Sequence, residues 1–215
     1  MTERAVPTQE CSTPKRNDDD VRSTLVQRVH DSIDVRCSIL EGALLDEVAG
    51  AVRVVIDAAR RRSTIIFIGN GGSSADAGHL AAELLGRFRV DRDPLPAIAL
   101  ADNTAAVTAI GNDYGYADVF SRQIAGVARP GDVLVGLSTS GKSANVVRAF
   151  ETARALGLTT VALTGAGGGC LLGLADHCLR IPSEDTARIQ ECHMLLGHAM
   201  CELVEGALLP RVFST

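Results

Sequence analysis

Short apolar runs rich in β-branched residues alternate with longer stretches of helical periodicity over most of the chain. Such runs, bounded by glycine and polar residues, are typical of strands that are buried on both faces of a parallel sheet. The pattern predicts an α/β fold, a doubly wound parallel five-stranded sheet flanked by helices. We expect strands at 64–68, 97–100, 132–137, 159–163 and 178–181, and helices near 74–86, 103–111, 116–128, 143–156 and 186–208.

The N-terminal region differs from this alternation. Residues 1–20 mix prolines, hydroxyl residues and an acidic run without apolar periodicity, so we expect a disordered tail. From 21 to 61, apolar residues such as Leu25, Val29 and Ile33 recur at helical spacing and predict two helices. Because a helical lead-in often mediates assembly, we expect residues 21–215 to form one domain that includes these oligomerisation helices.

Composition narrows the class of protein. The formal net charge of −5 argues against a nucleic-acid partner, which needs a basic face. No apolar run approaches the roughly 18 residues of a membrane span, and the start lacks a hydrophobic signal region, so we expect a cytoplasmic protein without a membrane partner. The six cysteines show no C-x-x-C spacing, which argues against a cysteine-based metal or redox site.

The helix expected at 74–86 carries an informative polar pair. His79 and Glu83 are four residues apart, so their side chains share one face and lie close enough to share an ion or a proton. The run Gly69-Asn70-Gly71-Gly72-Ser73 precedes them, and its glycines allow backbone N–H groups to approach a ligand phosphate or sugar. Together these features indicate an acid/base site beside a phosphate loop.

A simpler interpretation of the same helix stays open. His79, Glu83 and Arg87 can be the solvated stripe of an amphipathic helix whose inner face is apolar, and Ser73 can serve only as a helix cap. In that case the inward residues are Leu80, Leu84 and Leu85.

A second polar loop is expected between a buried strand and a helix that begins near Ser143. The hydroxyls of Ser138, Thr139, Ser140 and Ser143, with the N–H groups of the helix start, are typical of an anion cradle. Neither loop has the spacing of a nucleotide-triphosphate or dinucleotide motif, so we expect a phosphorylated small molecule. A hydroxyl-rich turn with a helix cap is the structural alternative.

With these motifs, the chain resembles the sugar isomerase (SIS) domain family, and within it the sedoheptulose 7-phosphate isomerases, or phosphoheptose isomerases. The resemblance covers roughly residues 60–205 and rests on Gly69-Asn70-Gly71-Gly72-Ser73, His79-x-x-x-Glu83, Gly86-Arg87, Gly111-Asn112-Asp113, Ser138-Thr139-Ser140-Gly141, Leu163-Thr164-Gly165 and Arg188-Ile189-Gln190-Glu191. It implies conversion of sedoheptulose 7-phosphate to D-glycero-D-manno-heptose 7-phosphate through an enediol(ate), the first step of activated heptose biosynthesis. It also implies a homotetramer with active sites between subunits.

The resemblance assigns roles to individual residues. It implies one zinc ion held by His79, Glu83, Gln190 and His198, with Glu83 and His198 also acting as the catalytic acid/base pair. The implied substrate-binding residues are Asn70, Gly71, Gly72, Ser73, Arg87, Asp113, Ser138, Thr139, Ser140, Ser143 and Gln190. In one departure, some relatives carry an aspartate directly before the Arg-Ile-Gln run, where this chain has Ala187.

The spacing of the later pair raises a question of geometry. Gln190 and His198 are eight residues apart, or about 12 Å along a helix axis. Either both side chains lean strongly toward one ion, or different subunits supply them. We expect the second arrangement, a metal site completed across a subunit contact. His193, among apolar neighbours on the same helix, is expected to be structural.

A non-catalytic SIS-domain protein that binds a replication initiator or another protein is the alternative function. Such relatives share the fold but tend to lack the later histidine and to alter the Ser-Thr-Ser-Gly loop. This chain keeps His198 and the loop at 138–141, which favours the isomerase.

Overall fold

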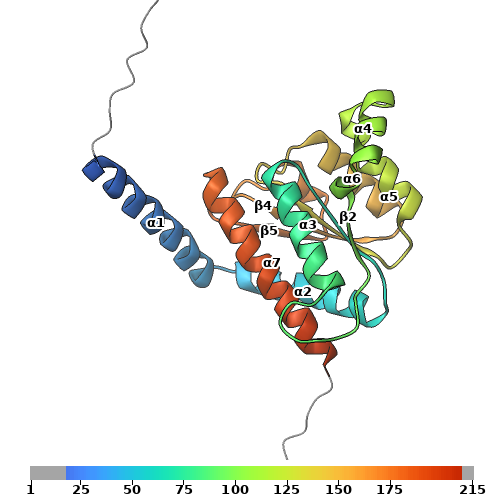
Figure 1. The fold of residues 1–215 in the computed structure, drawn as a ribbon, viewed down its shortest axis with the longest axis horizontal. Coiled ribbons are helices and arrows are strands. Elements are labelled where there is room, and N and C mark those ends of the chain that lie inside the picture. Colours follow the sequence, from blue (N-terminus) through green and yellow to red (C-terminus); the bar gives the residue numbers. More distant parts are fainter. Residues whose placement is uncertain (1–17, 210–215) are drawn as a thin grey trace, which may run out of the picture.

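The computed structural model describes residues 18–209, so residues 1–17 of the expected tail over 1–20 lie outside them. One sheet holds five parallel strands in the order β2-β1-β3-β4-β5 (Figure 1). The strands are β1 (Ile65–Gly69), β2 (Ala97–Ala99), β3 (Val133–Leu137), β4 (Thr159–Thr164) and β5 (His177–Arg180). The predicted five-stranded parallel sheet is therefore confirmed. β2 ends before Leu100, where a 3₁₀ turn, η1 (Leu100–Asp102), begins.

Helices cover both faces of this sheet. α2 (Leu44–Arg60), α3 (Gly72–Leu85) and α7 (Thr186–Leu208) lie on one face, and α5 (Ser121–Val127) and α6 (Ala144–Ala155) lie on the other (Figure 1). Strand β1 shows why the layers form, because alternate side chains point to opposite faces. Ile65 and Phe67 join the first core, whereas Ile66 and Ile68 join the second.

The helix expected over 116–128 is shorter than predicted. The structure has a 3₁₀ turn, η2 (Tyr116–Asp118), and then α5 from Ser121. Val119 and Phe120 are both buried in the core on that face, and Gly115 before the turn has a φ of 95°. The chain therefore turns into the core at Val119 and Phe120 before α5 begins. α4 (Thr104–Asp113), which precedes the turn, has no buried residue.

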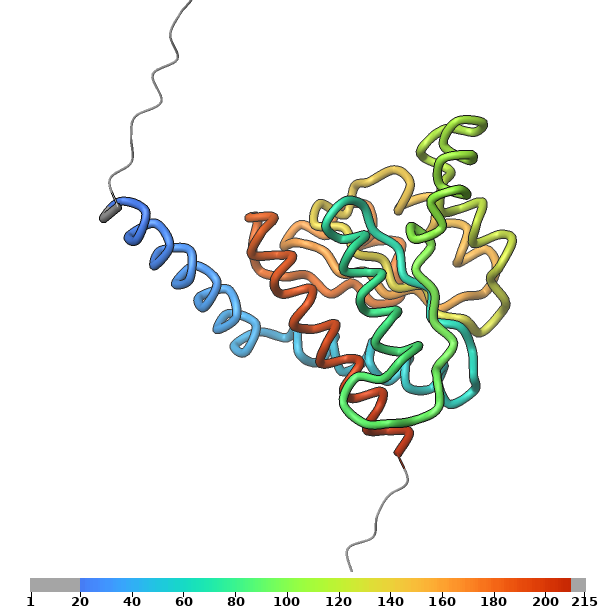
Figure 2. The backbone as a smooth tube through the Cα atoms, in the orientation of Figure 1, coloured from blue at the N-terminus to red at the C-terminus, as the bar shows by residue number. Residues whose placement is uncertain are grey.

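Helix α1 (Asp18–Glu41) extends away from the sheet domain, as Figures 1 and 2 show. It begins at Asp18, inside the expected tail. Its contacts with α7 include a hydrogen bond of 2.7 Å from Ser32 Oγ to Glu191 Oε2. Several of its apolar side chains are exposed, namely Val21, Leu25, Val26, Val29, Ile33 and Leu40. No helix among residues 18–209 has the length and apolar character needed to cross a membrane.

Candidate active site

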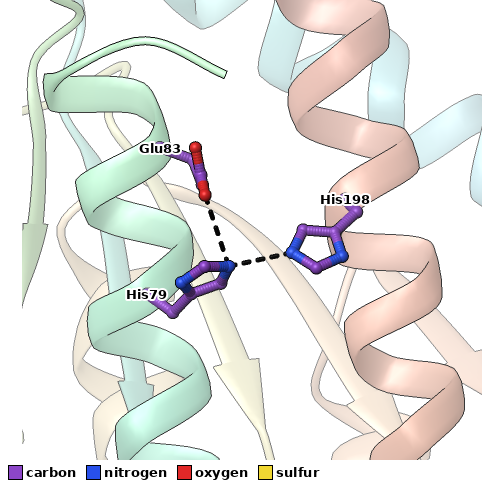
Figure 3. Close-up of side chains that lie close together, drawn as sticks. All are labelled: His79, Glu83 and His198. Atoms are coloured by element: carbon purple, nitrogen blue, oxygen red, sulfur yellow. Dashed lines mark hydrogen bonds and ion pairs between the residues drawn. The ribbon is translucent and has the colours of Figure 1, made fainter. Parts of the chain in front are cut away.

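Helices α3 and α7 lie side by side, and their close approach creates the candidate site. A Cβ atom at Gly197 would lie 2.7 Å from Leu80 Cδ2, so glycine lets α7 pack directly on α3. The next residue, His198, reaches across to His79, with 2.8 Å between the two Nε2 atoms (Figure 3). Residues distant in the sequence thus meet at a contact between two helices.

A carboxylate completes this polar cluster. Glu83 Oε1 lies 3.4 Å from His79 Nε2, and one ligand atom from each of His79, Glu83 and His198 lies within 4.8 Å of the others. The side chain of Glu83 is 22% exposed and that of His79 is 47% exposed, so the cluster opens to solvent. Phe88 stacks against the His198 ring at a centroid distance of 5.7 Å. These contacts with α7 go beyond a solvated stripe on α3.

The three side chains fit a divalent metal ion. Two imidazoles and a carboxylate occur together in catalytic zinc sites, which keep a fourth position open for water or substrate. Metal bonds of 2.0–2.2 Å at tetrahedral angles place ligand atoms about 3.4 Å apart. The observed separations of 2.8 and 3.4 Å are close to that spacing. The group can therefore hold an ion with small side-chain movements.

Gln190 has a different partner from the one the sequence suggested. Its Nε2 donates to Asp76 Oδ2 at 2.9 Å, at the start of α3. A single chain supplies His79, Glu83 and His198, so these three need no second subunit. That another subunit supplies a ligand stays a prediction for Gln190 alone. Asp76 was missed, although its spacing of three residues from His79 places both on one helix face.

The first glycine-rich loop connects β1 to α3 as expected. Gly71 has a φ of 57° and is the N-cap of α3, so the interpretation of Ser73 as the cap is wrong. Ser73 lies buried in the first turn, where it crowds Gly69. A Cβ at Gly69 would lie 2.6 Å from the carbonyl carbon of Ser73, which explains the need for glycine. The backbone N–H groups of the first turn of α3 therefore lie at this loop.

Asn70 in this loop belongs to a polar network that the sequence did not reveal. The Asn70 and Asn145 side-chain amides donate to each other at 2.9 and 2.8 Å, and the Tyr116 hydroxyl donates to Asn70 Oδ1 at 3.0 Å. Asn145 is buried at the start of α6, whereas Tyr116 is exposed in η2. The network fixes the orientation of the Asn70 amide, because its oxygen accepts two hydrogen bonds and its nitrogen donates one.

The second loop follows β3, which pairs with β1, so both loops lie at the same edge of the sheet. Ser138 Oγ lies 3.4 Å from Ser143 Oγ, and Ser140 Oγ accepts from the Lys142 N–H at 3.2 Å. α6 begins directly after Ser143, whose side chain makes no capping hydrogen bond. A cavity of about 330 Å³ lies here, and its lining includes Thr139, Ser140 and Lys142. The loop thus has the hydroxyls and the helix start expected of an anion cradle.

Comparisons with known proteins agree with this geometry. The family model described as SIS domain matches residues 30–165. Phosphoheptose isomerase of Rhodospirillum rubrum is 52% identical over 172 residues, covering 80% of this chain and 92% of that protein. The chain belongs to the phosphoheptose isomerase family of SIS-domain proteins. The phosphoheptose isomerase of Aquifex aeolicus is 44% identical over 84% of this chain and 94% of its own length.

Solved structures of the phosphoheptose isomerase family support the same assignment. Phosphoheptose isomerase GmhA from Neisseria gonorrhoeae has 39% identity and a TM-score of 0.81, covering 86% of this chain and 99% of that chain. A phosphoheptose isomerase from Francisella tularensis has 34% identity and a TM-score of 0.83, covering 86% and 98%. The family and the fold expected from the motifs are therefore confirmed.

Two of the substrate-binding residues assigned by resemblance to the phosphoheptose isomerases are exposed at the ends of helices. Arg87 is exposed just after the C-terminal end of α3, about 20 Å along that helix from the Gly71 loop. Asp113 is exposed at the end of α4, where its Oδ1 accepts from Asn112 Nδ2 at 2.7 Å.

Leu85, expected to point inward, is 48% exposed, whereas Leu80 and Leu84 are buried. Leu85 points about 100° away from Leu84 around the helix, off the face that Leu80 and Leu84 share.

Two buried groups on α7 belong to the core rather than to the site. His193 is fully buried, with Nε2 3.2 Å from the Thr164 carbonyl oxygen. Burial lowers the pKa of His193 to about 4, although the Thr164 carbonyl favours the charged form. Burial, with a smaller effect from the charge of Glu83, raises the pKa of the Cys201 thiol to about 12. Neutral His193 and protonated Cys201 fit the structural roles expected of them.

Proposed function

We propose that the protein isomerises the ketose sedoheptulose 7-phosphate to the aldose D-glycero-D-manno-heptose 7-phosphate, as an intramolecular aldose-ketose oxidoreductase. The observation that carries the proposal is the cluster of His79, Glu83 and His198, with 2.8 and 3.4 Å between its facing atoms. The family supports the same activity, since relatives named phosphoheptose isomerase cover most of the chain.

The reaction needs a group that moves a proton between two carbons. Glu83 takes a proton from C1 of the ketose and returns it to C2, passing through an enediol(ate). Glu83 faces His79 through Oε1, so its second carboxylate oxygen can serve as this base. His198 delivers a proton to the oxygen on C2 and removes one from the oxygen on C1. The aldehyde then forms at C1, with atoms and charge balanced.

We propose zinc as the ion of this site, one per active site, held by His79, Glu83 and His198 with Gln190 as the further ligand implied by the family. Bound there, the ion supplies a Lewis acid that offsets negative charge on the substrate oxygens. The donor set of two imidazole nitrogens and a carboxylate oxygen suits zinc. The facing Nε2 atoms of His79 and His198 would be the ligand atoms, which leaves the other ring nitrogen of His198 to carry a proton.

The loops at the sheet edge are proposed to hold the substrate phosphate and hydroxyls. Ser138, Thr139, Ser140 and Ser143 supply hydroxyls, and the starts of α3 and α6 supply backbone N–H groups. Gly71, Gly72 and Ser73 lie at the start of α3, next to Asn70. Lys142 adds a positive charge at the cavity beside Thr139 and Ser140. A phosphorylated sugar anchored there presents its other end toward α3.

A homotetramer with active sites between subunits is part of the proposal. Exposed apolar side chains on α1, among them Leu25 at 61% and Val29 at 60%, suit burial against other copies of the chain. Arg87 and Asp113 are exposed and can act at a neighbouring subunit's site. A mass in solution near four times 22.5 kDa would support this assembly. The cysteines among the described residues are unpaired, which suits a cytoplasmic protein.

Incubation of purified protein with sedoheptulose 7-phosphate tests the function directly. The product is largely present as its ring forms, in which the hydrogen on C1 is the anomeric hydrogen. This hydrogen can be followed by proton NMR, with and without a chelator. We expect conversion that the chelator abolishes and added zinc restores. No turnover by metal-loaded protein would shift weight to the alternative, a non-catalytic SIS-domain protein that binds a replication initiator or another partner. The cluster and the hydroxyl loop give that alternative little support.

A further inference from the structure

A buried carboxylate near the C-terminal end of α7 is saturated with hydrogen-bond donors. Glu205 is 2% exposed and accepts from the backbone N–H groups of Phe88, Arg89 and Val90 at 3.0, 2.8 and 2.8 Å. Burial alone raises the pKa of Glu205, but these three N–H groups and Arg92 outweigh it and hold the pKa below its ordinary value. Glu205 is therefore charged at neutral pH. Figure 2 shows the segment after α3 crossing this end of α7.

Arg92 connects this carboxylate to the other helix of the site. Its Nε lies 3.2 Å from Glu205 Oε2, and both side chains are almost fully buried. Its two terminal nitrogens donate to the carbonyls of Glu83 and Leu84, each at 2.9 Å. These carbonyls lie in the last turn of α3, which has no further turn to supply donors, and a cation suits a helix C-terminus. One guanidinium thus joins α3 to α7.

Arg92 and Glu205 each contact a candidate metal ligand directly or through one intervening residue. Arg92 holds the backbone carbonyl of Glu83 itself. Glu205 holds the backbone of Phe88, whose ring stacks on His198 at an interplanar angle of 27°. Further along the same two helices, Gly197 packs on Leu80. The pair therefore fixes the two helices beside the cluster, and fixes the residue that covers His198.

We propose that the Arg92–Glu205 clamp is a positioning device that sets the separation of α3 and α7, so that His79, Glu83 and His198 converge on one divalent cation. This inference deepens the proposed metal site and rests on it. Arg92 and Glu205 form a buried ion pair, and each also makes several hydrogen bonds to backbone groups. Such an arrangement holds its geometry more firmly than an exposed pair, because water does not compete for these contacts. Metal sites depend on such supporting contacts behind the ligands.

The chain offers a matched control for the clamp. Arg89 and Glu202 form an ion pair of 2.7 Å between the same segment and the same helix, but their side chains are 63% and 47% exposed. Exposed pairs are screened by water and contribute little. Arg89→Lys and Glu202→Gln therefore make the same chemical changes as Arg92→Lys and Glu205→Gln and leave both clamp side chains in place. The Arg89 guanidinium also lies 5.4 Å from the centroid of the Phe88 ring, so Glu202→Gln is the cleaner control.

The experiment measures Co²⁺ binding to chelator-stripped protein by its visible absorption, together with thermal unfolding of the metal-free protein. We expect Arg92→Lys and Glu205→Gln to weaken Co²⁺ affinity at least tenfold, and Arg89→Lys and Glu202→Gln to stay within twofold of the unmodified protein. If Glu205→Gln does not fold, Arg92→Lys carries the test, because it keeps the charge that faces Glu205. Folded clamp variants that bind Co²⁺ normally would overturn the inference.

Two further variants separate positioning from other causes. Asp132 is also a buried carboxylate that accepts from two backbone N–H groups, those of Thr64 and Arg129, but it lies at the start of β3. Asp132→Asn should lower the unfolding temperature while leaving Co²⁺ affinity unchanged; an equal loss of affinity would mean that lost stability explains the clamp result. His79→Ala should abolish binding. Unchanged Co²⁺ binding by His79→Ala would refute the proposed metal site itself. If His79→Ala loses Co²⁺ binding but the clamp variants bind normally, only the clamp is refuted.

Discussion

Helix α7 carries two histidines, five residues apart, in opposite surroundings. His193 is fully buried among core residues and faces the carbonyl of Thr164. His198 is half-buried, faces the imidazole of His79 across the contact with α3, and lies beside Glu83 (Figure 3). Five residues along a helix turn the direction of a side chain by about 140°, which places the two rings on different sides.

The difference shows what a histidine needs in order to do chemistry. Burial holds His193 neutral, with a pKa of about 4, and its Nε2 faces a backbone carbonyl rather than a carboxylate or a second imidazole. His198 combines solvent access with two groups that can share an ion or a proton. The residue type is the same, so access and neighbours separate the packing role from the proposed chemical role.

Removing the carboxylate from the His198 cluster should have the largest effect. Glu83→Gln keeps the shape of the side chain but removes the proposed base, so we expect kcat to fall by about 10³-fold, within the usual range for general-base catalysis. Unfolding temperature should change little, because Glu83 is partly exposed. Glu202→Gln, an exposed carboxylate on α7, should retain full activity. Substantial activity of Glu83→Gln in the isomerase assay would contradict the assigned role.

His198→Asn tests the half-buried member of the histidine pair. The asparagine cannot relay protons between the two substrate oxygens, so we expect about a 10²-fold loss of kcat. The mass in solution and the unfolding temperature should stay near those of the unmodified protein, as measured by light scattering and calorimetry. Dissociation or unfolding of this variant would show that His198 serves assembly more than proton transfer.

His193→Gln tests the buried member through the pH dependence of stability. The folded-state pKa of His193 is about 4 and the ordinary value is 6.5, so the unfolded chain binds the proton more readily. The contribution of neutral His193 is therefore present above pH 6.5 and is lost as the pH falls toward 4, by up to about 3 kcal/mol. Urea unfolding at pH 7 and pH 4 should show a smaller acid loss for His193→Gln than for the unmodified chain.

The control for that measurement is His30→Gln. His30 is exposed on α1, so its removal should leave the acid loss of unfolding free energy as it is in the unmodified protein. Equal acid losses in the His193→Gln variant and the unmodified protein would mean that His193 is not buried in its neutral form.

The sheet was predictable from the sequence because its signal is local. The run 65–68 is continuously apolar, since helices cover both faces of β1, and the structure sends Ile65 and Ile66 into separate cores. The helix expected at 186–208 has the observed bounds of α7, because it starts after the capping residue Asp185. These features depend on neighbouring residues, whose spacing is visible in the chain.

The candidate site was only partly predictable because its key contacts join distant segments. The spacing of His79 and Glu83 showed that they share a helix face, but the approach of His198 depends on Gly197 packing against Leu80. Nothing in the spacing of Glu205 indicated that it accepts three backbone N–H groups from the segment after α3. Such contacts arise when two helices that are distant in the sequence pack together, so no short stretch of sequence reveals them.

Phe88→Leu should have the smallest effect and sharpens the contrast between the two histidines. The leucine keeps an apolar cover over His198 but removes the flat ring that stacks on it at 5.7 Å. An aromatic contact of this kind contributes about 0.5–1.5 kcal/mol, so we expect roughly a threefold loss of kcat. Steady-state kinetics at saturating substrate measures it. A loss as large as that of His198→Asn would mean that the Phe88 ring itself contacts the substrate, because a cover that merely orients an imidazole cannot account for so large a change.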